Sequence, residues 1–111
     1  MKIVLDYKKG WFGRFRKLKI YLSGDVFLTG MKQGQRKEVE IPEKTESLFG
    51  KMDWAKTEKI KIEDLSEGDC VELFPTIPQN THKVTAFLLK SLPIRIVIRN
   101  KDGFQKSPET Q

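Results

Sequence analysis

The most constraining feature of this sequence is a series of short runs in which apolar and polar residues alternate. Leu18, Ile20 and Leu22 alternate with polar or amphipathic neighbours, and near the end of the chain Ile94, Ile96 and Ile98 alternate with Arg95, Val97 and Arg99. A period of two is typical of strands with one buried face, and no window keeps a helical i, i+3, i+4, i+7 pattern over three turns. The expected strands occupy residues 2–8, 17–22, 26–29, 38–41, 48–52, 59–62, 70–74, 84–89 and 94–98.

Eight or nine short strands at spacings near ten residues predict an all-β fold, either a small β-sandwich or a partly open β-barrel with mainly antiparallel strands. The chain has 111 residues, enough for one core. We therefore expect a single β domain over residues 1–99, followed by a polar, aperiodic and flexible tail over residues 100–111. The inward positions of the runs predict the core: Leu5, Leu18, Ile20, Leu22, Val26, Leu28, Val39, Ile41, Leu48, Ile60, Ile62, Val71, Leu73, Ile94, Ile96 and Ile98.

About half of the chain resembles PEGA-type modules, which are small β-sandwich repeats found mostly in bacterial and archaeal surface proteins. The matching pieces are turn and strand signals at residues 19–24, 34–43, 48–51 and 67–73, with Lys44-Thr45 where the family motif has Gly-Ala. This resemblance implies a non-catalytic accessory or adhesion-like module. It carries over no functional residues.

The net charge of +6 is distributed unevenly along the chain. Residues 1–20 hold seven bases and one acid, whereas residues 38–72 hold five bases and eleven acids. If the two segments lie apart in space, the resulting field would steer a polyanion to one side or pair the molecule head-to-tail with a second copy. If the strands bring the segments together, much of this field cancels. The sequence leaves both arrangements open.

The densest group of candidate binding residues lies between residues 11 and 19. Aromatic rings stack on bases or sugars, and neighbouring cations neutralise phosphates, so the composition suits a polyanion such as single-stranded nucleic acid. The alternative is a strand whose cations point to water while its aromatic rings cover one end of the core. A separate indole, Trp54, could stack on a sugar ring or pack at the core edge. The candidates in the segment are Trp11, Phe12, Arg14, Phe15, Arg16, Lys17 and Lys19.

The sequence offers no recognisable catalytic or metal-binding set. The single cysteine, Cys70, lies in an alternating run beside Asp69 and Glu72, whose charges disfavour the thiolate that a nucleophile needs. The single histidine, His82, has no second histidine or Cys-x-x-Cys near it. We therefore expect no catalytic residues, no metal and no cofactor, and a protein that is not an enzyme.

The expected function is a non-enzymatic binding or structural module whose partner is another protein or a polymer. The alternatives are a polyanion or single-stranded nucleic-acid binder, and a carbohydrate or surface-associated binding module. A homo-oligomer is compatible with the charge pattern. No apolar run is long enough to span a membrane and the start of the chain lacks a signal-peptide pattern. The expected location is the cytoplasm, or outside it if a leader has been removed.

Overall fold

The structure, a computed structural model, describes residues 1–10, 16–52, 55–75 and 94–106. Within these ranges the chain forms nine strands and one short 3-10 helix, so the all-β prediction is confirmed. The expected strand at residues 84–89 lies outside the described residues. The elements are β1 (Lys2–Tyr7), β2 (Leu18–Leu22), β3 (Val26–Met31), β4 (Arg36–Glu40), β5 (Ser47–Met52), β6 (Ala55–Lys56), β7 (Ile60–Lys61), η1 (Ile62–Asp64), β8 (Cys70–Pro75) and β9 (Ile94–Arg99).

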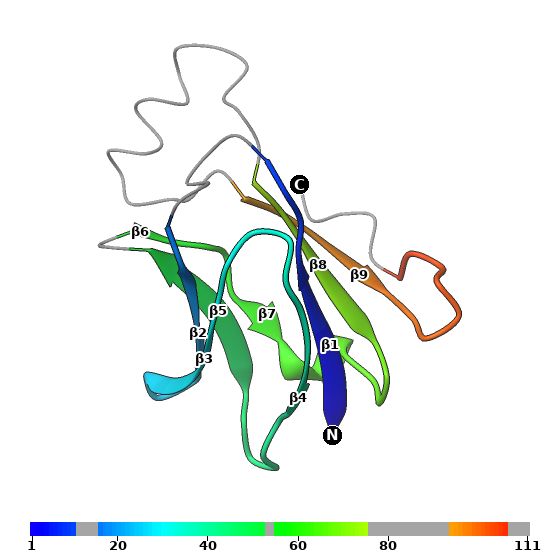
Figure 1. The fold of residues 1–111 in the computed structure, drawn as a ribbon. Coiled ribbons are helices and arrows are strands. Elements are labelled where there is room, and N and C mark those ends of the chain that lie inside the picture. Colours follow the sequence, from blue (N-terminus) through cyan, green and yellow to red (C-terminus); the bar gives the residue numbers. More distant parts are fainter. Residues whose placement is uncertain (11–15, 53–54, 76–93, 107–111) are drawn as a thin grey trace.

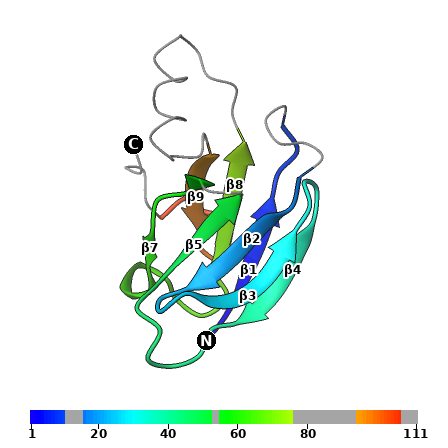
Figure 2. The same cartoon turned by 90° about the vertical axis from the view of Figure 1, so that its left-hand side faces the viewer.

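The strands form two sheets that face each other as a sandwich (Figure 1). A four-stranded sheet has the order β4-β1-β8-β9, and a five-stranded sheet has the order β3-β2-β5-β6 with β7 also paired to β5. Figure 2 shows the second sheet from outside, with β5, β2 and β3 in front of β8 and β1. The pairing is antiparallel except between β1 and β8, which are parallel.

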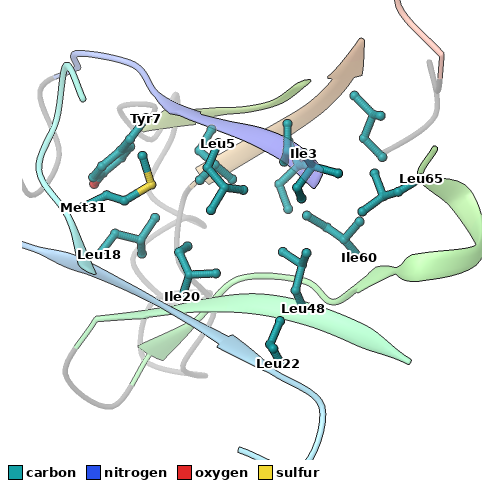
Figure 3. Close-up of a cluster of buried hydrophobic side chains, with 14 of the residues drawn as sticks. Ile3, Leu5, Tyr7, Leu18, Ile20, Leu22, Met31, Leu48, Ile60 and Leu65 are labelled. Carbon is teal, nitrogen blue, oxygen red and sulfur yellow. The ribbon is translucent and has the colours of Figure 1, made fainter. Parts of the chain in front are cut away.

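The core lies between the two sheets and follows their period-two pattern. Ile3, Leu5 and Tyr7 point from β1 toward Leu18 and Ile20 on β2 (Figure 3). These side chains are at most 1% exposed, because successive residues of a strand point to opposite faces and the inward ones are covered by the other sheet. Most of the predicted core is confirmed as buried, and Leu28, Val39, Ile62 and Ile94 are partly buried against it.

The prediction that Val26 belongs to the core is wrong. Val26 pairs with the buried Leu22, but it lies at the end of the sandwich, where it lines an open depression with Pro42 and is 54% exposed. Strand β3 is also at the edge of its sheet, with a bulge opposite Ile20 and Tyr21 that interrupts the alternation. Because Val26 pairs with Leu22, its side chain still points to the inner side of the sheet, as the pattern predicted. The opposite sheet does not extend far enough to cover it.

Two turns set how the strands meet. The turn between β2 and β3 has positive φ angles at Gly24 (81°) and Asp25 (59°), a conformation that glycine and aspartate tolerate best. Residues 32–35 carry the chain from β3 in one sheet to β4 in the other. Here the Lys32 amide donates to the Gln35 side chain and the Gln35 amide donates to the Lys32 carbonyl.

The first part of the expected tail is held against the sandwich. The Lys106 amide donates to the Ile98 carbonyl at 2.7 Å, and the Lys106 ammonium lies 2.5 Å from the buried Asp69 carboxylate. Asn100 closes the turn between them by accepting from the amides of Asp102 and Phe104. Residues 100–106 thus have defined contacts, while residues 107–111 lie outside the described ranges, and the flexibility of the tail stays a prediction.

Candidate functional site

The strands of the five-stranded sheet contain no aspartate or glutamate. Their charged residues are four lysines, Lys19, Lys51, Lys56 and Lys61. Each alternates with a buried inward residue, so all four point to the outer face of this sheet, the face turned to the viewer in Figure 2. This outer face therefore carries positive charge without carboxylates from its own strands.

Three of these lysines form a row across three neighbouring strands. Lys19 on β2 lies directly opposite Lys51 on β5, and Lys51 lies directly opposite Lys56 on β6. We call these three residues the lysine row. Like charges directly opposite each other on one face of a sheet destabilise it. The lysine row therefore carries a repulsion that an anionic neighbour would offset.

A row of aromatic rings runs beside the lysine row. Phe27 on β3 is opposite Tyr21 on β2, and Tyr21 is opposite Phe49 on β5. The rings of Tyr21 and Phe27 meet edge to face with centroids 5.7 Å apart, and those of Tyr21 and Phe49 stack at 5.7 Å and 13°. We call these three residues the aromatic row, and both rows together with Lys61 the lysine–aromatic face.

Two lysines of this face, Lys51 and Lys56, have aromatic partners. The Lys56 ammonium lies 5.3 Å from the centroid of the Phe49 ring, and the Lys51 ammonium lies 6.0 Å from that of Tyr21, both within cation–π range. In the described part of the chain, none of the four lysines takes part in an ion pair.

On the outer face of the four-stranded sheet, acidic and basic side chains form ion pairs. Asp6 lies between two bases, 3.0 Å from Arg36 and 2.8 Å from the Lys8 ammonium. Glu72 on the next strand lies 2.7 Å from Arg99 and 3.6 Å from Lys8. We call these five residues the ion-pair face. Their charges nearly cancel, so this face offers little net attraction to an ion.

Cys70 lies beneath the ion-pair face. Its Sγ and a carboxylate oxygen from each of Asp6 and Glu72 lie within 4.8 Å of one another, a ligand-like grouping. Both carboxylates are already engaged by the bases of that face. Burial raises the pKa of the Cys70 thiol, and the two carboxylates add to the shift against nearby Arg36 and Lys8. The neutral thiol that results is the opposite of an activated nucleophile.

Two acidic residues between η1 and β8, Asp69 and Glu67, also have structural partners. Asp69 is 2% exposed, accepts a hydrogen bond from the Ser66 amide and pairs with Lys106. Glu67 accepts from the Lys2 amide at 3.1 Å. Their carboxylates stabilise the turn before β8 and its contact with the end of the chain.

Of the candidate residues in the basic aromatic segment, the structure describes three. Lys19 belongs to the lysine row, and Lys17 is exposed with its Cδ 3.9 Å from where a Cβ on the outward-facing Gly30 would lie. Arg16 is exposed just before β2. The other candidates lie outside the described residues: Trp11, Phe12, Arg14, Phe15 and Trp54.

The residues that the sequence interpretation missed come from β2, β3, β5, β6 and β7. Lys51 and Lys56 belong to the segment with a net excess of acids, and Phe27 was assigned only to a strand. In the sequence, the residues of this face are the outward-facing members of the alternating runs. To group them into one face, the pairing of β2 with β5 must be known, and the runs themselves do not specify it.

Comparison of the chain with protein-family models, curated proteins and solved structures finds no match. The resemblance to PEGA-type modules therefore stays a prediction. Across the described residues, no helix is long and apolar enough to cross a membrane.

Proposed function

We propose that this protein is a non-enzymatic binding module that binds an anionic polymer through the lysine–aromatic face. The observation that carries the proposal is the lysine row, in which three cations lie opposite one another on a sheet whose strands hold no carboxylate. A bound polyanion would turn the repulsion within this row into attraction, since each anionic group would neutralise a lysine and release condensed counterions.

An extended ligand fits this face better than a small anion does. The lysine row crosses three strands on an open sheet surface, and Lys61 adds a cation from a fourth strand. A single phosphate bound tightly by a protein usually has converging donors and a concave, partly buried site. A chain of anionic groups, in contrast, gains affinity by contacting several separated lysines at once.

The proposal is tested by fluorescence anisotropy with two labelled probes, a heparin oligosaccharide and a single-stranded oligothymidylate, each titrated at several salt concentrations. The test variant replaces the lysine row by glutamine (Lys19→Gln, Lys51→Gln and Lys56→Gln). The matched control makes the same lysine-to-glutamine change at three exposed lysines elsewhere, Lys2, Lys32 and Lys101, so that the net charge changes equally. Both variants are checked for a native thermal unfolding transition.

We expect the wild type and the control variant to bind at least one probe, with affinity that falls steeply as salt rises. For a single-stranded nucleic acid each phosphate contact contributes about 0.7 to the log–log salt slope, so the lysine-row variant loses about 2. If neither probe binds at low salt, or if the control variant loses as much affinity as the lysine-row variant, the proposal is wrong.

A further inference from the structure

The aromatic ring of Phe27 is exposed and packs against a neighbouring ring. The residue is 55% exposed although large aromatic side chains are normally mostly buried. It belongs to the edge strand β3, and its ring meets Tyr21 at an interplanar angle of 72°. Tyr21 is itself stacked on Phe49, which is 4% exposed. The exposed ring is therefore supported from one side by two packed rings, so that binding to it orders few additional groups.

The aromatic row and the lysine row lie close together along the same strands. Tyr21 is two residues from Lys19 on β2, and Phe49 is two residues from Lys51 on β5. Two residues of an extended strand span roughly 7 Å, and both members of each pair point to the same side. The aromatic row and the lysine row therefore lie side by side on one face, with Phe27 one strand further out, opposite Tyr21. A polymer that has a flat group and a phosphate in each repeating unit would contact both rows at once.

We propose that the anionic polymer is single-stranded nucleic acid, with a base stacked on the Phe27 ring and neighbouring phosphates on the lysine row. This inference rests on the proposed function, and it adds the ligand class and the residue that recognises the base. The Phe27 ring, opposite Tyr21, lies on one side of the bound nucleic acid. The lysine row lies along the phosphate backbone on the other side. Base stacking tolerates any sequence, since every base has a π face.

Two other polyanion classes fit these rings less well. In double-stranded nucleic acid the faces of the bases are already stacked on one another, so a ring on an open sheet cannot reach them without melting the duplex. Sulfated polysaccharides offer anionic groups to the lysines but no aromatic face to stack on Phe27. Both are therefore expected to bind, if at all, through the lysine row alone.

The test compares probes and variants in one anisotropy series. The probes are a single-stranded oligothymidylate, an abasic oligonucleotide with the same number of phosphates, a duplex of the same length and the heparin oligosaccharide. The variants are Phe27→Ala, which removes the ring, and Phe27→Leu, which keeps an apolar side chain without a π face. Because Phe27 is half exposed, both variants should fold, and thermal unfolding verifies this.

We expect Phe27→Ala and Phe27→Leu each to weaken oligothymidylate binding between about 5-fold and 150-fold, the range of one lost base stack. Affinity for the abasic strand and for heparin should stay unchanged in both variants. If the wild type binds the abasic strand, the duplex or heparin as tightly as oligothymidylate, the nucleic-acid inference is wrong while polyanion binding stands. If the wild type binds none of the four probes, the proposed function itself is wrong.

Discussion

On the ion-pair face each carboxylate lies between two bases, whereas on the lysine–aromatic face lysine lies opposite lysine. The two faces belong to the same sandwich. Strands of the four-stranded sheet hold five bases and four acids, while those of the five-stranded sheet hold four bases and no acid. The first arrangement stabilises the fold, whereas the opposed lysines of the second repel one another.

Under the proposed function, this difference separates stability from binding within one small domain. Residues at binding surfaces are often less than optimal for stability, because the groups that bind a ligand are left without partners in the free protein. A consequence can be measured directly. Substitutions on the ion-pair face should lower stability, and suitable substitutions on the lysine–aromatic face should raise it while weakening binding.

The largest effect on stability is expected from Asp6→Asn. Asp6 is 7% exposed, and its carboxylate accepts contacts from Lys8 and Arg36, so the substitution leaves two cations without their shared counter-ion. We expect the free energy of unfolding to fall by about 1–2 kcal/mol, because both partners retain some solvent. Urea denaturation measures this change.

The matched control for this prediction is Glu38→Gln, which removes one negative charge from an exposed position on β4 of the same sheet. Its effect should stay within about 0.5 kcal/mol. Equal losses for the two variants would mean that net charge, rather than the ion pairs of Asp6, stabilises this face.

An effect of opposite sign is expected from Lys19→Glu on the lysine–aromatic face. The new carboxylate would lie directly opposite Lys51, so a repulsive pair becomes an attractive one. We expect the free energy of unfolding to rise by about 0.5–1 kcal/mol in low salt, with a smaller gain in high salt because the pair is exposed. Thermal unfolding at two salt concentrations measures it. A loss of stability that does not depend on salt would show that Lys19 has a structural role instead.

The smallest effect concerns Cys70 and pH. Because burial raises the pKa of the thiol in the folded protein, the unfolded chain ionises first as the pH rises past the ordinary thiol value of 9.0. The contribution of the thiol is complete below that pH and declines above it. The difference in melting temperature between wild type and Cys70→Ala should therefore narrow as the pH is raised through 9.0. A difference that stays constant would show that the thiol ionises equally in both states.

The strands were largely predictable from the sequence because each of them alternates. Leu18, Ile20 and Leu22 are buried as their spacing requires, and Gly24-Asp25 forms the expected turn. The position of Val26 was not predictable, since its exposure depends on where the opposite sheet ends. Strand β6 was not among the expected strands, because two residues are too few to show a period.

The candidate site was predictable only in part. The basic aromatic segment included Lys17 and Lys19, which are exposed beside β3 and β5. Their role in binding stays a prediction. The charge pattern along the chain was misleading for Lys51 and Lys56, which lie in an acidic segment whose strand carboxylates belong to the other sheet. Which lysines share a face is decided by strand pairing over long sequence distances, and composition does not record it.

The most direct test is a two-dimensional NMR titration of the isotopically labelled protein with the single-stranded oligothymidylate, which compares the two outer faces in one experiment. We expect the largest amide shift changes at Lys19, Tyr21, Phe27, Lys51 and Lys56, because a strand bound on the lysine–aromatic face contacts these residues. Amides of the ion-pair face, including Arg36, Glu72 and Arg99, should move little. Shift changes concentrated on the ion-pair face, or spread evenly over both faces, would contradict binding through the five-stranded sheet.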